Sequence, residues 1–451
     1  MALPRALAPL RHPAYRVLAA ALALALLTQG LWAIAMVWQV VALGGGPGAL
    51  SLVAALSAGG MLVMTLFGGA LADRVPQRHL LLTVSLLQGV AVSVAAALSL
   101  TDALQVWHLA AVALADGVAL GLFYPAYSAL VPAIVPEDDL LAVNGLEGAV
   151  RPVLGQAAGP AAAGFLVAAY SPGAALAVTA AVAFAAAACV LALPMTPVRR
   201  EVAADGSRPG LLADVREGFR YMVATPWLLA TLLFAAFMIL AFIGPFEVLV
   251  PFVIEDAGGG ASQHGWVLAA FGIGGALGSL VVASRRLPRR YLTVMNLLWG
   301  LGCLPMVVFG LTSDLGLMLA AAAVLGATFQ AGTVIWGTLL QRRVPPALLG
   351  RVSSLDFFVS LSFMPLSMAL AGPLAELVGM TGAFLVAGLA PPVFCVVAIL
   401  AARLPADEMA HPLDVPAEEA PAEKPTAAAA AWMGGDGAGT APAREGEPWP
   451  S

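Results

Sequence analysis

The chain has 451 residues, of which 61% are hydrophobic and only 10% are charged, and its formal net charge is −5. Its mean hydropathy is +0.93, whereas soluble domains carry about 25% charged residues. This composition excludes an ordinary soluble protein and predicts a polytopic membrane protein, with the lipid bilayer as its partner and no nucleic acid.

Twelve long apolar segments follow one another along the chain. They lie at about 17–42, 49–72, 79–101, 105–135, 141–170, 172–194, 226–254, 262–284, 291–312, 314–340, 350–377 and 381–403. Since runs of this length satisfy their backbone in lipid only as helices, we predict an all-α protein with twelve transmembrane helices. The first run is too long for a signal peptide, so it is expected to remain as helix 1.

Apart from Arg151, the arginine residues lie in the tails or in alternate connections between these segments. They cluster at 5–16, 74–78, 199–220, 285–290 and 342–351, and the connections on the other side contain no Lys or Arg. By the positive-inside rule, both termini are predicted to be cytoplasmic and the number of helices to be even. We expect a multi-pass protein of a bacterial inner membrane.

The two halves of the sequence repeat each other. Residues 73–80 align with 285–292, which lie 212 positions later, and residues 135–147 align with 344–356 at a constant spacing of 209. Such a repeat predicts a substrate cavity between two six-helix halves, near the midplane of the membrane. The predicted parts are an N-terminal half (1–194), a cytoplasmic connecting loop (195–225), a C-terminal half (226–403) and a disordered cytoplasmic tail (404–451).

Arg151 is the basic residue that lies well inside an apolar segment, about ten residues from its start. An unpaired cation at that depth costs roughly 3 kcal/mol, so a partner or water is implied. Glu147 lies one helical turn earlier and can form an i,i+4 ion pair with Arg151. Asp116 also lies near mid-depth, about eleven residues into the fourth segment.

The repeat singles out Asp116 and Arg151, because they align with Leu325 and Ser360 and the fold therefore does not need either charge twice. We predict that they form a proton-coupling pair, and a permanent structural ion pair is the alternative. Glu247 follows Gly244-Pro245 in the seventh segment and is a candidate for a second protonation or cation-binding site.

Glu147 and Asp356 occupy equivalent positions in the two repeats. Symmetric placement favours a structural role in gating, such as an ion pair with Arg351 or with arginines of the loops.

Several aromatic and amide side chains inside the apolar segments have the character of a pocket for drug-sized amphipathic ligands. The predicted substrate-binding residues are Gln29, Trp32, Tyr124, Tyr127, Gln330 and Trp336. Helix packing or a place in an interfacial aromatic belt is the alternative for each of them.

Signatures of catalysis or ATP use are missing from the sequence. It has no phosphate-binding Gly-rich loop with Lys-Ser/Thr, no metal-ligand spacing, and no buried His-Asp or nucleophile pair. The three cysteines lie in apolar runs and suggest small core residues. We therefore expect neither an enzyme nor a bound cofactor or metal.

The connection after the second segment, 69–78 with the sequence GALADRVPQR, resembles the signature loop of the major facilitator superfamily. Residues 155–164 resemble the helix 5 motif of its drug-exporting branch, and 344–354 with 371–373 are similar to the enterobactin-exporter and macrolide-efflux group. The resemblance covers about 1–403. One departure is Arg285, which stands in the second half where the first half has Asp73.

The resemblance implies a fold of two six-helix halves and a loop that latches the inward-closed state. The residues it assigns to gating are Gly69, Asp73, Arg74, Arg78, Gly155, Gly159 and Pro160. The leading hypothesis is a monomeric secondary transporter that exports a hydrophobic or amphipathic small molecule by proton antiport. An importer or facilitator and a lipid flippase are the alternatives.

Overall fold

All the secondary structure that the structure describes is helical, as predicted. The structure, a computed structural model, describes residues 9–72, 74–136, 139–195 and 211–413. Eleven helical stretches within these ranges are long and apolar enough to cross a membrane. The last, Arg351–Ala401, has 51 residues. A straight helix of that size would be about 76 Å long, more than twice the thickness of the hydrocarbon core. Gly379 interrupts it with a φ of 77°, so the stretch accounts for two of the twelve predicted segments.

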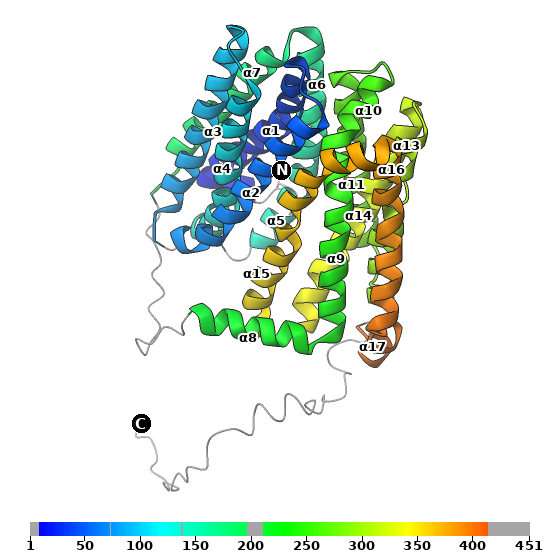
Figure 1. The fold of residues 1–451 in the computed structure, drawn as a ribbon. Coiled ribbons are helices and arrows are strands. Elements are labelled where there is room, and N and C mark those ends of the chain that lie inside the picture. Colours follow the sequence, from blue (N-terminus) through cyan, green and yellow to red (C-terminus); the bar gives the residue numbers. More distant parts are fainter. Residues whose placement is uncertain (1–8, 73, 137–138, 196–210, 414–451) are drawn as a thin grey trace, which may run out of the picture.

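Two groups of helices stand side by side, with the N-terminal half in blue to cyan and the C-terminal half in green to orange (Figure 1). The N-terminal half contains α1 (Pro13–Ala42), α2 (Pro47–Ala72), α3 (Gln77–Leu100), α4 (Val106–Ile134), α5 (Leu140–Arg151), the π-helix η3 (Pro152–Ala158), α6 (Gly159–Ala169) and α7 (Pro172–Leu191). The C-terminal half contains α9 (Pro226–Gly244), the π-helix η4 (Pro245–Leu249), α10 (Val250–Asp256), α11 (Ala261–Ala283), α12 (Tyr291–Gly302), α13 (Met306–Leu311), α14 (Leu315–Arg343), α15 (Pro346–Ser362) and α16 (Met364–Ala401).

Proline and capping residues fix where many of these helices begin. The helices α1, α2, α7, α9 and α15 start at a proline, whose fixed φ suits the first helical position and whose missing N–H is not needed there. Ser171 Oγ accepts from Ala174 N (3.1 Å) at the start of α7, and Asp314 Oδ1 accepts from Leu317 N (2.8 Å) at the start of α14.

The predicted connecting loop at 195–225 contains a helix that the sequence analysis missed, α8 (Leu211–Ala224). Glu217 of α8 forms an ion pair with Arg351 of α15. The backbones approach closely there, because a Cβ atom at Gly218 would meet Leu355 Cδ1 at 3.0 Å. In Figure 1, α8 runs across the lower end of the molecule beside α15 and α9. Residues 196–210 lie outside the described residues.

The tail predicted to be disordered from residue 404 begins with a packed helix, α17 (Leu404–Ala410). Glu408 Oε2 accepts from the backbone N atoms of Leu292 (2.9 Å) and Thr293 (3.1 Å), and so caps the N-terminus of α12. Asp407 forms an ion pair with Arg343 at 2.5 Å. The C-terminal half therefore extends beyond residue 403, and residues 414–451 lie outside the described part of the chain.

Two polar contacts between the described parts of the two halves lie near one end of the bundle. The connections at this end include 43–46, 101–105, 257–260 and 312–314, which contain no Lys or Arg, so we call it the arginine-poor face and the opposite end the arginine-rich face. Trp38 Nε1 of α1 donates to His264 Nδ1 of α11 (3.3 Å), and both side chains are buried. Ser51 Oγ of α2 accepts from Gly372 N of α16 (2.8 Å).

Small residues bring the halves together at the same end. A Cβ atom at Gly372 would lie 2.8 Å from Gly48 Cα, one at Gly265 would lie 2.7 Å from Pro160 O, and one at Gly164 would lie 2.5 Å from Ala261 O. These distances leave no room for a side chain, so the small residues allow the helices to approach closely. The protein is thus closely packed across its halves toward the arginine-poor face.

Candidate functional site: two related polar clusters inside the helices

Arg151 is neutralised by its neighbours in the N-terminal half. Its Nη2 atom donates to Glu147 Oε2 at 3.0 Å, which confirms the predicted i,i+4 pair. Tyr127 OH donates to Glu147 Oε1 at 2.6 Å. The guanidinium carbon lies 5.1 Å from the ring centroid of Tyr124 and 5.6 Å from that of Tyr127, within range of cation–π attraction. We call Tyr124, Tyr127, Glu147 and Arg151 the N-terminal cluster.

A second carboxylate inside the bundle has only neutral donors. Trp336 Nε1 of α14 donates to Asp356 Oδ2 of α15 at 3.0 Å, and Ser360 Oγ lies 3.4 Å from Asp356 Oδ1, which is long for a bond between oxygens. The Trp336 ring packs against Trp227 and Trp299, with centroids 6.3 Å and 6.2 Å away. We call Trp336, Asp356 and Ser360 the C-terminal cluster.

The two clusters are copies of one arrangement. The hydrogen-bonding aromatic residue, the carboxylate and the residue one turn later are each separated from their counterpart by 209 positions. Tyr127 thus corresponds to Trp336, and both donate to the repeated carboxylate. The sequence repeat aligns Glu147 with Asp356 and Arg151 with Ser360, whereas this aromatic pair was not predicted. The constant spacing would have revealed it, although Tyr and Trp differ in kind.

The predicted pair between Asp116 and Arg151 is not formed. Asp116 is 6% exposed, and its Oδ1 accepts from Gln88 Nε2 of α3 at 2.9 Å. Arg151 instead covers Tyr124, which is eight residues and about 12 Å further along α4. Glu147 is closer to Arg151 in sequence and lies on the same helix face, so it meets the need for a counter-ion.

The predicted pairing of Asp356 with Arg351 or loop arginines also needs correction. No Lys, Arg or His of the described chain forms an ion pair with Asp356, and Arg351 pairs with Glu217 of α8. The helix α8 was not predicted, so its acidic residue was not considered as a partner.

Glu247 lies in the π-helix η4, directly after the Gly244-Pro245 step of the seventh span. No hydrogen bond or ion pair to its side chain occurs within the described residues. The other π-helix, η3, begins at Pro152 immediately after Arg151. Single π-helical turns are rare and often mark functional positions in helices. Both π-helices therefore adjoin charged residues inside a span.

A buried hydroxyl group joins the backbone at the start of η4. Ser367 Oγ of α16 accepts from Gly244 N and donates to Leu240 O, each at 2.7 Å. These two backbone groups are four residues apart and would bond directly to each other in a regular helix. The serine side chain therefore bridges two backbone groups of the seventh span, Pro226–Asp256, next to Pro245.

The predicted substrate residues divide into two sets. Tyr124, Tyr127 and Trp336 belong to the clusters. Gln29 is half-buried and Trp32 is buried in α1, and Gln330 packs on α11, where a Cβ at Gly275 would meet its Cγ at 2.8 Å. Contact of any of these six residues with a substrate stays a prediction.

Of the residues predicted to gate the protein, Arg78 has a clear contact. Its Nη2 donates to Leu191 O at 2.5 Å and so satisfies a carbonyl at the C-terminus of α7. Arg74 is exposed just after α2, which contains Gly69, and Asp73 lies outside the described residues.

The helix 5 motif forms a close helix contact. A Cβ atom at Gly159 would lie 2.7 Å from Gly30 Cα of α1, and one at Gly30 would lie 2.7 Å from Pro160 Cδ. Gly155 lies within η3. The motif packs α1 against η3 and α6 within the N-terminal half. Its role in gating stays a prediction.

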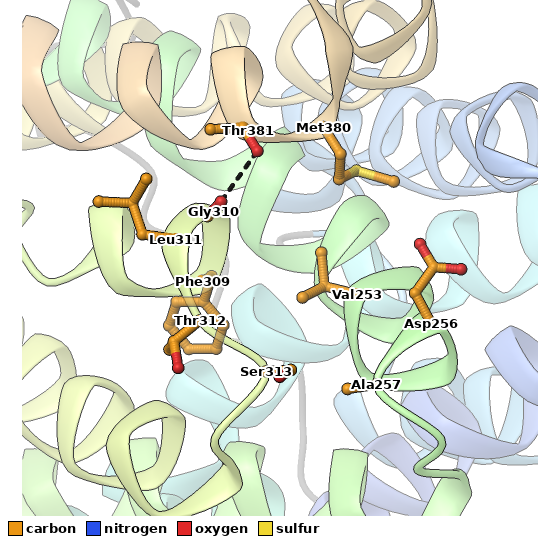
Figure 2. Close-up of a pocket in the computed structure, with 10 residues that line it drawn as sticks. All are labelled: Val253, Asp256, Ala257, Phe309, Gly310, Leu311, Thr312, Ser313, Met380 and Thr381. Atoms are coloured by element: carbon orange, nitrogen blue, oxygen red, sulfur yellow. Dashed lines mark hydrogen bonds between the residues drawn. The ribbon is translucent and has the colours of Figure 1, made fainter.

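A small cavity of about 280 Å³ opens near the arginine-poor end of the C-terminal half, between α10, α13 and the second part of α16. Figure 2 shows Asp256 and Met380 at its edge and the hydrogen bond from Thr381 Oγ1 to Gly310 O (2.9 Å). None of the predicted site residues lines it, so we assign it no part in the function.

Comparison with known proteins identifies the family of this twelve-segment chain. The transmembrane secretion effector family matches residues 4–426. The chain belongs to this family of efflux transporters. The multidrug efflux pump Tap of Mycolicibacterium fortuitum is 30% identical over 83% of this chain and 92% of its own. Macrolide efflux protein A of Streptococcus pyogenes is 23% identical, over 81% and 90% of the two chains. The enterobactin exporter EntS of Escherichia coli O1:K1 / APEC is 27% identical, over 76% and 81%.

Solved structures of the major facilitator superfamily share the fold. The nucleoside transporter NupG superposes with a TM-score of 0.65 at 15% identity, over 86% of this chain and 98% of its own. A D-xylose-proton symporter also gives 0.65, at 14% identity over 86% and 95%. These likenesses confirm the predicted major facilitator fold. Together with the family match they show a multi-pass membrane transporter of small molecules and not an enzyme.

Proposed function

We propose that this transporter is a proton-coupled exporter of hydrophobic or amphipathic small molecules. It takes them up at the arginine-rich face, which the positive-inside rule assigns to the cytoplasm. The two halves rock about a site near mid-membrane. The named efflux functions of Tap, macrolide efflux protein A and EntS support export. Close packing toward the arginine-poor face is what an exporter needs while it loads substrate from the cytoplasmic side.

The observation that carries the proposed coupling is the presence of Asp116 and Glu247 inside the spans without a cationic partner. Asp116 meets only the amide of Gln88, and Glu247 has no hydrogen-bond partner among the described residues. A carboxyl group is cheapest to hold in a membrane span when it carries a proton or meets a cation. Arg151 is already matched by Glu147, so we assign it to the scaffold, and Asp116 and Glu247 to proton movement.

Uptake into inverted membrane vesicles tests the proposal, since uptake there corresponds to export from the cell. Vesicles energised with an acidic interior should accumulate the uncharged probe N-phenyl-1-naphthylamine when they contain the wild-type protein. Asp116→Asn should abolish accumulation but keep downhill equilibration, because the Asn oxygen still accepts from Gln88 while the proton carrier is lost. Glu255→Gln, at an exposed acid near the end of α10, is the matched control and should accumulate the probe normally.

Three results would contradict this proposal. Full gradient-driven accumulation by Asp116→Asn would remove that residue from coupling. Accumulation only in right-side-out vesicles would show import, and movement of labelled phospholipid in place of the probe would show a flippase.

A further inference from the structure

The C-terminal cluster repeats the N-terminal cluster without its cation. In both, an aromatic donor and a carboxylate meet between helices, but the residue one turn after the carboxylate is Arg151 in one and Ser360 in the other. In the N-terminal cluster the guanidinium lies on the carboxylate and within 5.6 Å of the centroids of two aromatic rings. In the C-terminal cluster, the equivalent residue Ser360 approaches the Asp356 carboxylate with a short, neutral side chain.

The arginines nearest to Asp356 in sequence and in packing form ion pairs with other acidic residues. Arg343 pairs with Asp407 at 2.5 Å and lies 4.8 Å from the ring centroid of Trp227, on which Trp336 packs. Arg351 pairs with Glu217. Among the described residues, Asp356 therefore has the tryptophan and the serine as its hydrogen-bond donors and no ion pair.

The Asp356 carboxylate can accept more hydrogen bonds than the described residues donate to it. Each oxygen of a carboxylate has two lone-pair directions, and here one oxygen holds a single 3.0 Å bond while the other has only the long 3.4 Å contact with Ser360. The carboxylate is half-buried. The Trp336 ring that donates to it packs against the rings of Trp227 and Trp299, with centroids 6.3 Å and 6.2 Å away. A negative charge beside an aromatic wall is the chemistry that recognises organic cations.

We propose that Asp356, with the Trp336 ring, binds the positive charge of a cationic aromatic substrate in the place that Arg151 occupies in the other half. This inference rests on the proposed function and names one class of its substrates, monovalent cations with a large apolar body. In that site the substrate cation supplies the counter-charge that Arg151 supplies to Glu147, and an uncharged substrate gains nothing from Asp356.

Replacement of Ser360 by Arg places an arginine one helical turn after the carboxylate, as in the N-terminal cluster. This variant tests the proposal directly. We would measure binding of tetraphenylphosphonium, a permanent aromatic cation, to purified full-length protein by equilibrium dialysis. Ser360→Arg and Asp356→Asn should each weaken binding about tenfold or more, because a cation–carboxylate contact is lost. Ser360→Gln adds length without charge and should bind within about twofold of wild type. Asp356→Glu should retain binding.

Vesicle uptake of uncharged N-phenyl-1-naphthylamine separates this inference from the proposed function. Glu255→Gln, at an exposed side chain outside the C-terminal cluster, should leave both that uptake and the cation binding unchanged, and a monodisperse size-exclusion profile checks that Ser360→Arg and Asp356→Asn are folded. Wild-type binding of tetraphenylphosphonium by both Ser360→Arg and Asp356→Asn would overturn the cation site. So would a wild-type protein that transports the neutral probe but does not bind the cation. Loss of neutral-probe uptake in Asp356→Asn with intact cation binding would assign Asp356 to proton movement, and would also overturn the proposal.

Discussion

The N-terminal and C-terminal clusters share a geometry but differ in charge. Glu147 meets a phenol and a guanidinium, so its cluster is neutral as a whole, whereas Asp356 meets an indole and a hydroxyl group. Duplication therefore preserved an aromatic donor on one helix and a carboxylate on the next, and only the third position differs in charge. The comparison shows that the charge inside this transporter is a property of single positions and not of the fold.

Removing the carboxylate of the N-terminal cluster should have the largest effect on stability. Glu147→Gln leaves the Arg151 cation inside a span without its counter-ion. We expect a loss of about 3 kcal/mol, the lower end of the range for a broken buried pair, because Arg151 is 29% exposed. The monodisperse fraction after heating, measured by size-exclusion chromatography, should fall. Asp356→Asn should cost much less, because only neutral donors lose a partner.

The double variant Glu147→Gln/Arg151→Gln is the control for that experiment. It should recover most of the lost stability, since no unpaired charge remains. Equal losses in Glu147→Gln and Asp356→Asn would contradict the difference in charge between the clusters.

The arginine-rich ends of the two halves differ as well, and Glu408 allows that difference to be tested. Glu408→Gln weakens the cap on α12 and should lower stability by about 1–2 kcal/mol. Glu255→Gln, at an exposed side chain near the end of α10, is a matched control that should leave the melting temperature unchanged. An unchanged melting temperature for Glu408→Gln would mean that α17 does not contribute to the stability of the C-terminal half.

Removal of the aromatic hydrogen-bond donors tests whether the two clusters share one geometry. Tyr127→Phe and Trp336→Phe each remove one hydrogen bond to a carboxylate, at 2.6 Å and 3.0 Å respectively. Each should destabilise the protein by about 1.5 kcal/mol, the lower end of the contribution of a hydrogen bond to a charged group. Thermal melting of both variants checks this. A loss in only one of them would show that the geometry is not equivalent in the two halves.

The smallest effect is expected at Asp139, which has Leu348 as its repeat counterpart. Hydrogen bonds from His12 and Arg11 lower the pKa of Asp139 below its ordinary value, so the folded state favours the carboxylate. Its stabilising contribution is therefore present above the unfolded pKa, near 4, and is lost as the pH falls through the lower folded value. Asp139→Asn should melt slightly below wild type at pH 7, and the gap should close below about pH 4. A gap that widens in acid would contradict the assignment.

Apolar runs were enough to predict the helical segments, because lipid restricts a buried backbone to helices, and the repeated halves were predicted from the alignment of two stretches of the sequence with each other. The pair between Glu147 and Arg151 was also predictable, since it depends on helix periodicity alone. The partners of Asp116 and Arg351 were not, because Gln88 and Glu217 come from other helices and only packing brings them together. The helices α8 and α17 were missed because they lie outside the apolar pattern that guided the prediction.

The hydroxyl group of Ser367 ties the seventh span to α16. It accepts from Gly244 N and donates to Leu240 O, so both backbone groups beside Pro245 meet a polar partner within the membrane. The helix α16 also contacts α2 of the other half, where Gly372 N donates to Ser51 Oγ. Two serine hydroxyl groups thus link α9, α16 and α2 into one hydrogen-bonded series that crosses the interface of the halves.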